Sequence, residues 1–148
     1  MRVIDSFRGK HFFLSNFYPA RVLFRGQEFP TAEHAFMSAK TTDEHSIEQI
    51  RTAPTPAEAK RIGRSVILVD DWDRVRFDAM ADVLAAKFDD ASLARRLAAT
   101  GGATLIEGNT WHDQVWGSCT CDTHRNFDGG NALGVLLMRE RLRHLLFL

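Results

Sequence analysis

Hydrophobic and polar positions alternate near the start of the chain as they do in short β-strands. Val22-Leu23-Phe24 and Gln27-Glu28-Phe29 flank Arg25-Gly26, a pair that is typical of a tight hairpin turn. Residues 3–29 are therefore predicted to form short strands in a small antiparallel sheet. An aromatic loop over residues 13–19, closed by a proline, is expected to interrupt them.

The apolar spacing changes from strand-like to helical after residue 30. With Thr31 as N-cap, a helix is predicted over about residues 32–40. Positions 33, 36, 37 and 40 then share one face. That face is largely apolar, yet it carries Glu33 in the first turn and Lys40 at the opposite end.

Capping signals predict further helices along the rest of the chain. Ser46 and Ser92 are expected to cap two of them, and Thr55-Pro56-Ala57-Glu58 is a capping box with proline at the first helical position. The predicted helices cover residues 46–53, 56–63, 72–88, 92–100 and the stretch from about 131, with an isolated strand over residues 103–107. This pattern favours a predominantly helical α+β fold over a repeated βαβ arrangement.

Composition narrows the class of protein. The chain has 148 residues, of which 45% are hydrophobic and 26% charged, so a single globular domain over residues 1–148 is expected. The formal net charge is zero, which argues against strong nonspecific nucleic-acid binding but permits a local phosphate site. Residues 1–5 lack the apolar core of a signal peptide, and no apolar run approaches membrane-spanning length, so we expect a cytoplasmic protein without membrane association.

The cysteines offer an incomplete metal motif. Cys119 and Cys121 are followed by His124, which supplies three potential ligands without a second cluster to complete a tetrahedral site. We therefore expect free buried thiols and no metal. The chain also lacks a glycine-rich phosphate loop and the H-E-x-x-H and G-x-S-x-G motifs, so no cofactor is expected, and carboxylate-based hydrolysis is the economical chemistry.

Several polar residues could serve a ligand, and each has a structural alternative. Asn16 lies between aromatic residues and could contact a ligand or simply form a turn. Glu33 could act in chemistry or neutralise the helix N-terminus. Lys40 could extend to solvent from the helix end. Arg61 and Arg64 could hold a phosphate, or be the usual cations of a helix C-terminus.

A second group of candidates lies in the loop over residues 107–117. Trp111 and Trp116 could stack on a planar heterocycle while Asp113 acts nearby. The alternative is a core filled by the tryptophans, with solvated polar neighbours.

Taken together, these segments resemble the NADAR family of YbiA-like proteins. The signature pieces are Phe-Leu-Ser-Asn-Phe at 13–17, Phe-Pro-Thr-Ala-Glu-His-Ala-Phe at 29–36 and Asn-Ala-Leu-Gly-Val-Leu-Leu-Met at 131–138. Further matching pieces, in the same order, are residues 39–40, 59–64, 71–72, 80, 86–88, 93–101, 105–107, 113 and 116–117. Order and spacing hold from about residue 7 to 141. Residues 119–128 depart from the shorter glycine-rich linker of the riboflavin-linked bacterial members and look more like Cys-containing members.

The resemblance implies a mainly helical α+β fold and N-glycosidase activity. Members are associated with hydrolysing N-glycosidic bonds of ribosylamino-pyrimidine phosphates, which are intermediates of riboflavin biosynthesis. Others are associated with removing ADP-ribose from guanine. The family's acid maps onto Glu33, its loop acid onto Asp113 and its aromatic residue onto Trp72.

Glycosidic cleavage builds an oxocarbenium-like sugar cation, which a carboxylate can stabilise. We therefore expect Glu33 and Asp113 to converge on one cleft as the catalytic pair. Lys40 is expected to help electrostatically, or by a Schiff base with an open-chain ribosyl aldehyde. Substrate binding is assigned to Asn16, Arg61, Arg64 and the aromatic residues Phe17, Trp72, Trp111 and Trp116.

Three functions of different classes follow. The first is an N-glycosidase for small phosphorylated ribosyl substrates of the riboflavin pathway. The second is a hydrolase that removes ADP-ribose from guanine in nucleic acid. The third is a non-catalytic module that binds ADP-ribose or NAD, which the presence of both Glu33 and Asp113 disfavours because the phosphates of such ligands are anionic.

Overall fold

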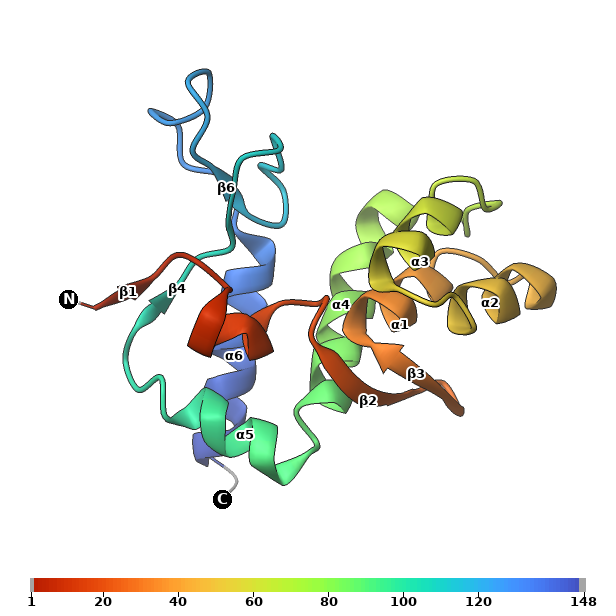
Figure 1. Ribbon diagram of the computed structural model, residues 1–148, viewed down its shortest axis with the longest axis horizontal. Coiled ribbons are helices and arrows are strands. Elements are labelled where there is room, and N and C mark those ends of the chain that lie inside the picture. The colour runs from red at the N-terminus through yellow and green to blue at the C-terminus, as the bar shows by residue number, and fades with distance from the viewer. Residues whose placement is uncertain (1, 147–148) are drawn as a thin grey trace. The chain divides into compact units, whose positions relative to one another are not determined.

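The computed structural model of the protein describes residues 2–146. The chain folds into two compact units. One, the middle unit, is Asn16–Asp89; the other, the terminal unit, combines Met1–Ser15 with Asp90–Leu148. Each unit is built from segments with their own packed elements (Figure 1). The expectation of one domain over residues 1–148 stays a prediction.

The middle unit begins with the predicted hairpin. Strands β2 (Pro19–Phe24) and β3 (Gln27–Thr31) pair antiparallel, with Val22 opposite Phe29. Arg25 and Gly26 have φ of 50° and 80°, which is the positive-φ pair that a type I′ turn requires. The inward side chains Val22 and Phe29 are buried, so the alternation in the sequence is the alternation of the two faces.

Helix α1 (Ala32–Ser38) follows the hairpin and is buried along its whole length. Thr31 is its N-cap, because the threonine hydroxyl accepts a hydrogen bond from the His34 backbone N–H at 3.2 Å. The helix contacts α2, α3, α4 and β3, which explains its burial on all sides. It ends at Ser38, two residues before the predicted end.

The next two helices begin at capping residues, one of which was mispredicted. Helix α2 (Glu44–Arg51) is capped by Asp43, not by Ser46: one Asp43 carboxylate oxygen accepts from both the Ser46 backbone N–H and its hydroxyl. Helix α3 (Pro56–Gly63) is capped by Thr55, as predicted. A carboxylate accepts from an N–H more strongly than a hydroxyl does, which favours Asp43 over the serine.

Gly63 ends α3 for a packing reason. The following residue, Arg64, has an ordinary helical φ of −73°, so the glycine does not supply a left-handed turn. A methyl group at Gly63 would instead overlap the buried side chain of Met37 in α1. The glycine therefore permits the close approach of α1 and α3.

Helix α4 (Trp72–Lys87) is the longest of the middle unit and begins after Asp71, whose φ is 57°. Its buried face contains Met80, Val83 and Leu84, as the spacing predicts. Lys87 is also buried at the end of this face.

The terminal unit pairs the two ends of the sequence. Strand β1 (Val3–Ile4) lies parallel to β4 (Thr104–Leu105), with Val3 opposite Thr104. The strand predicted to be isolated therefore has a partner from 101 residues earlier in the chain. The segment between β1 and the hairpin contains a 3-10 helix, η1 (Gly9–Leu14), where strands were predicted. The prediction of an isolated strand was wrong because its partner strand is too distant in sequence for local patterns to show.

Two helices and a loop complete the terminal unit. Helix α5 (Ala91–Ala98) is capped by Asp90 rather than Ser92, and α6 (Ala132–Leu146) begins where predicted. Between β4 and α6, the short parallel strands β5 (Gly108–Asn109) and β6 (Ser118–Cys119) are the only regular structure in the described loop over residues 108–131.

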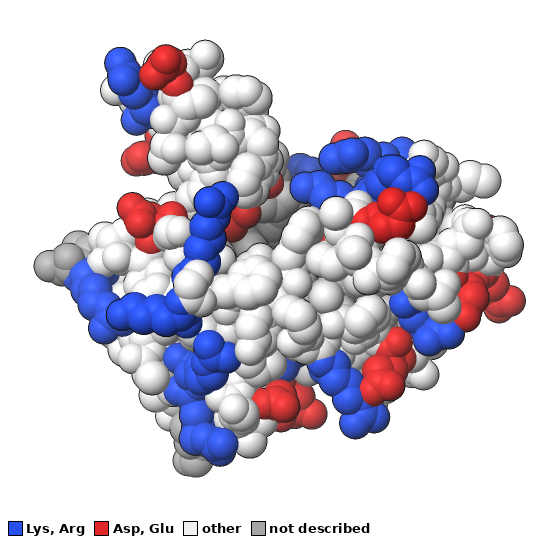
Figure 2. Space-filling view, in the orientation of Figure 1, with Lys and Arg blue, Asp and Glu red and all other residues white. Residues whose placement is uncertain are grey.

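The predicted class is confirmed: the chain is α+β and mostly helical, with a small antiparallel sheet near its start. Within the described residues, none of the helices combines the length and apolar character that crossing a membrane requires. Basic and acidic side chains are both spread over the face shown in Figure 2, in keeping with the net charge of zero.

Candidate functional site

Glu33 lies in the first turn of α1, as predicted, and only 7% of its surface is exposed. Its backbone N–H donates to the Asn16 carbonyl at 2.9 Å, which joins the start of α1 to the loop that precedes β2. The helix dipole favours a negative charge at this position. A carboxylate so withdrawn from water costs free energy to bury unless it is used or paired, which distinguishes it from an ordinary helix-end acid.

Asn16 lies beside Glu33 in the fold and has an unsatisfied polar atom. Its side chain is 9% exposed, and its amide nitrogen lies 3.5 Å from the Met80 sulfur. The side-chain oxygen has no hydrogen-bond partner among residues 2–146. A buried oxygen without a partner is expensive, so this atom is well suited to accept a hydrogen bond from a ligand.

Lys40 follows the C-terminal end of α1 and is half-buried. Desolvation lowers the pKa of its amine, while the nearby Glu33 carboxylate raises it and the Arg64 guanidinium lowers it further. The net direction is downward. The three charges are therefore electrostatically coupled within the middle unit, and Lys40 is a better proton donor or nucleophile than an exposed lysine.

Two of the aromatic residues predicted to stack on a substrate, Phe17 and Trp72, belong to the middle unit. Trp72, at the start of α4, packs against Phe36 of α1 with ring centroids 5.3 Å apart and an interplanar angle of 42°. Trp72 and Phe17 are both half-buried, so part of each ring is accessible for stacking on a base.

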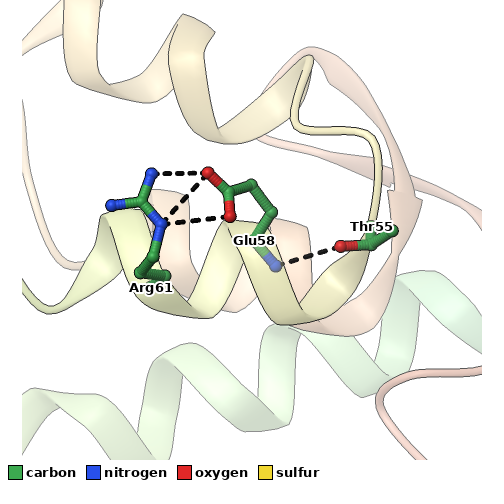
Figure 3. A network of polar contacts seen from close by, with 3 residues as sticks. All are labelled: Thr55, Glu58 and Arg61. Carbon is green, nitrogen blue, oxygen red and sulfur yellow. Dashed lines mark hydrogen bonds and ion pairs between the residues drawn. The ribbon is translucent and has the colours of Figure 1, made fainter.

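The two arginines predicted to hold phosphate differ in their surroundings. Figure 3 shows Thr55 capping α3 at Glu58, and Glu58 in turn holding Arg61. The Arg61 Nε donates to both Glu58 carboxylate oxygens, at 3.1 and 3.0 Å. Arg61 is exposed and already neutralised by this pair, whereas Arg64 is coupled to Lys40, so Arg64 is the stronger phosphate candidate.

Lys87 is a candidate that sequence reasoning missed. Its side chain is fully buried, and its amine lies 5.9 Å from the Tyr18 ring centroid and 5.3 Å from that of Phe88. The helical spacing placed it on the apolar face of its helix without assigning it a role. A lysine on such a face was the signal that it is buried for a reason other than packing.

His34 follows Glu33 in the sequence and is also buried, but both of its ring nitrogens are hydrogen-bonded within the protein. Its Nδ1 lies 2.7 Å from the Thr31 hydroxyl and its Nε2 lies 3.0 Å from the Ala53 carbonyl. Burial lowers the pKa of His34, although the hydrogen bond to Ala53 raises it. The neutral imidazole therefore donates from Nε2 to Ala53 and accepts at Nδ1 from Thr31, tying the N-cap of α1 to the end of α2.

Asp113 lies in the loop of the terminal unit, where one of its oxygens has a backbone role. Oδ1 accepts from the backbone N–H groups of Val115 and Trp116, at 3.0 and 2.8 Å. These bonds hold the carboxylate in one orientation. Trp111 is 51% exposed and Trp116 half-buried, so the alternative of a core filled by both tryptophans is wrong for Trp111.

The predicted site residues are thus divided between the units. The middle unit contains Asn16, Phe17, Glu33, Lys40, Arg61, Arg64 and Trp72, and the terminal unit contains Trp111, Asp113 and Trp116. Within the middle unit the structure brings Glu33, Lys40 and Arg64 into one electrostatic group, and a backbone hydrogen bond joins Asn16 to Glu33. The convergence of Glu33 and Asp113 stays a prediction.

The count of three potential metal ligands was incomplete. His112 joins Cys119, Cys121 and His124, and the ligand atoms of the four residues all lie within 4.8 Å of one another. Cys119 is buried, as expected of a buried thiol, but Cys121 is half-buried. The fourth ligand was missed because it precedes β6 in the chain and only the fold of the loop returns it to the cysteines.

Comparisons with known proteins identify the family to which this chain is similar over nearly all of its length. The family model described as the NADAR domain matches residues 5–145. N-glycosidase YbiA of Escherichia coli K12 is 38% identical over 135 residues, covering 86% of this chain and 78% of that protein. The riboflavin biosynthesis protein VVA0006 of Vibrio vulnificus is 34% identical over 134 residues, covering 88% of this chain but 35% of that larger protein.

A solved structure of a YbiA protein has the same fold as this chain. The NMR structure of the E. coli protein YbiA superposes with a TM-score of 0.82 at 33% identity, covering 99% of this chain and 88% of that one. The predicted family and the YbiA-like fold are thereby confirmed. The prediction of an enzyme acting on N-glycosyl compounds is confirmed at the level of the family, because the curated relatives carry the name N-glycosidase.

Proposed function

Because the chain belongs to the NADAR domain family, we propose that it is an N-glycosidase that hydrolyses ribosylamino-pyrimidine phosphates, intermediates of riboflavin biosynthesis. The names of the relatives support this assignment at two levels. Relatives matched over 78% of their own length are named N-glycosidases, and longer relatives from Vibrio vulnificus and Arabidopsis thaliana are named riboflavin biosynthesis proteins. A cleavage of this kind would remove an unstable ribosylamine by separating its sugar phosphate from its base.

The observation that carries the proposal is the buried acid Glu33, whose backbone N–H is bonded to Asn16, a residue with a buried side-chain oxygen that has no partner among the described residues. A carboxylate held away from water stabilises a neighbouring sugar cation more strongly than an exposed one does. The Asn16 oxygen can accept from a ribose hydroxyl or from a base N–H. A site that only bound anionic ADP-ribose would gain nothing from a buried negative charge.

In the proposed reaction the C1′–N bond breaks and its electron pair leaves with the nitrogen of the base. Glu33 stabilises the resulting oxocarbenium-like sugar and accepts a proton from the attacking water. Lys40, with its lowered pKa, supplies electrostatic help. Arg64 holds the phosphate through its guanidinium, and Trp72 stacks on the pyrimidine.

Asp113 is proposed as the second carboxylate, which protonates or orients the leaving base. Its fixed orientation supports this role, because two backbone N–H groups hold one oxygen and leave the other for a substrate. Trp111, exposed beside it in sequence, is available to stack on the base.

The test is a pair of parallel incubations of the purified full chain. One contains the ribosylamino-pyrimidine phosphate, with release of ribose 5-phosphate followed by mass spectrometry; the other contains an ADP-ribosylated guanine oligonucleotide, with release of ADP-ribose followed in the same way. A protein-free sample and the Glu33→Gln variant correct for spontaneous breakdown of the ribosylamine. Product above both controls in the first incubation is the expected result.

The other outcomes would overturn the proposal in distinct ways. Product in the second incubation alone would assign the chain to ADP-ribose removal from guanine. Saturable binding of ADP-ribose with no product in either incubation would identify a binding module.

A further inference from the structure

A second site of chemical interest lies in the loop over residues 108–131 of the terminal unit. The Cys121 sulfur is 3.3 Å from the His112 Nδ1 and 3.2 Å from the His124 Nδ1. The two imidazole Nδ1 atoms are 3.4 Å apart, and the Cys119 sulfur is 3.9 Å from the His112 Nδ1. Two sulfurs and two nitrogens therefore face a common point.

These separations are those of ligands around a tetrahedral ion. Zn–S and Zn–N bonds of about 2.3 and 2.0–2.1 Å at tetrahedral angles place neighbouring ligand atoms about 3.3–3.8 Å apart. Four of the six separations between ligand atoms are 3.2 to 3.9 Å, close to this interval, and all six are within 4.8 Å.

The loop brings the four ligands together through its backbone. The Thr120 N–H donates to the Asn109 carbonyl at 2.8 Å and continues the β5–β6 pairing past Cys119. The Cys121 carbonyl accepts from the N–H groups of His124 and Arg125, at 3.1 and 2.8 Å, which is the turn that returns His124 to the cysteines. A cysteine pair at the end of a strand followed by such a turn is a compact way to present ligands.

Side chains hold the remaining ligand in place. Buried Asn109 accepts from the N–H groups of Trp111 and Asp113, at 3.2 and 3.1 Å, and donates to the Asp113 carbonyl at 2.9 Å. These bonds enclose His112, whose φ is 70°, a conformation that costs free energy for a residue other than glycine. Gln114 accepts from the Cys119 N–H at 2.7 Å, so the loop is built around its ligands.

We propose that His112, Cys119, Cys121 and His124 bind one Zn²⁺ ion in a closed tetrahedral site with two sulfur and two nitrogen ligands. Four protein ligands leave no open position for water or substrate, so the ion has a structural role. It replaces the apolar core that the loop lacks and orders the segment containing Trp111 and Asp113. The proposal is independent of the substrate, because it concerns only the ligands and the loop.

The first experiment measures metal content in the full chain purified without chelators. Elemental analysis is expected to find about one zinc per chain, and replacement by Co²⁺ to give the intense d–d bands of tetrahedral cobalt with sulfur-to-cobalt charge transfer. His112→Ala is the main variant, because this side chain is exposed and its replacement is expected to leave the fold outside the loop intact. Cys121→Ser tests a sulfur ligand, and His45→Ala, an exposed histidine of α2, is the matched control.

Both ligand variants are expected to bind Co²⁺ at least tenfold more weakly and to lose or change the charge-transfer spectrum, while His45→Ala retains it. Metal-free protein with both thiols reduced and no uptake of Zn²⁺ or Co²⁺ would overturn the proposal. So would an unchanged cobalt spectrum in His112→Ala, or a Cys119–Cys121 disulfide in a protein that still binds no metal after reduction.

Hydrogen exchange supplies a readout separate from any enzymatic activity. Removal of the ion by a chelator is expected to speed exchange of residues 108–131 and to leave α1 unchanged. Equal exchange of the loop with and without metal would contradict the structural role of the ion.

Discussion

The surroundings of Glu33 in α1 and the loop over residues 108–131 both hold polar groups in fixed positions, but by different means. Around Glu33, a buried helix contacts three other helices and two strands, and apolar packing holds the polar groups in place. In the loop, strands of two residues each are supplemented by side chains that bond to backbone, as Asn109, Asp113 and Gln114 do.

The two regions are therefore stabilised by different kinds of interaction. Burial stabilises α1 through many small apolar contacts, which tolerate the loss of any one polar bond. The loop relies on a few polar bonds and four converging ligands, so a single substitution removes a large share of its stabilisation. The two acids proposed for catalysis come one from each region.

The largest expected effect is on turnover. Glu33→Gln preserves the size of the side chain but removes its charge, so kcat/KM for the ribosylamino substrate should fall by roughly 10²–10⁴-fold, measured from steady-state rates. Asp113→Asn should also lower the rate, with its backbone bonds to Val115 and Trp116 retained because the amide oxygen still accepts. Glu44→Gln, an exposed acid in the first turn of α2, is the control, and wild-type turnover by Glu33→Gln would eliminate the catalytic assignment.

Next is the loss of a loop clamp. Asn109→Ala removes the side-chain bonds to the backbone of Trp111 and Asp113 and should destabilise the loop by about 2–3 kcal/mol. Hydrogen exchange of residues 108–131 checks this, with exposed Asn126→Ala for comparison. Unchanged exchange in the Asn109 variant would show that the loop has another source of order.

A smaller effect is expected from the helix contact in the middle unit. Gly63→Ala gains up to about 1 kcal/mol of helix propensity, but its methyl group displaces buried Met37, which costs about 1–3 kcal/mol. The net prediction is a loss of about 1 kcal/mol in the free energy of unfolding, measured in urea. At Gly102, where no atom of residues 2–146 would contact the added methyl, alanine should not destabilise; equal effects at both positions would contradict the packing argument.

The last prediction concerns the pH dependence of stability. Because burial lowers the pKa of His34 in the folded protein, the unfolded chain binds more protons between that pKa and about 6.5. The contribution of neutral His34 to stability is therefore fully present above about pH 6.5 and is lost as pH falls through the folded pKa. Urea unfolding across this range should show a slope of up to about 1.4 kcal/mol per pH unit from this group. His34→Gln should reduce the slope, and exposed His45→Gln should not.

Much of the middle unit could be predicted from local signals. Thr31 and Thr55 cap their helices, and Arg25-Gly26 makes the hairpin turn, because each depends on bonds within a few residues. Ser46 and Ser92 were wrong as caps since Asp43 and Asp90, three and two residues away, are better acceptors. Local patterns predicted the helices correctly but did not distinguish between neighbouring candidates for the capping residue.

Distant pairings lay beyond that reach. The pairing of β1 with β4 places Val3 opposite Thr104, 101 residues later in the chain. The proximity of Asn16 to Glu33 depends on the hairpin between them. No periodicity encodes such contacts, because they are decided by which surfaces pack once all the elements exist.

The class of fold, the family and the acids to test could be inferred from the chain alone, since caps, spacing and ordered motifs are properties of neighbouring residues. Three findings required the folded structure: Asn16 has a buried oxygen without a partner among the described residues, Lys87 is buried, and His112 completes a set of four ligands. Burial and convergence arise from packing between segments, and distance along the chain does not measure distance in the fold.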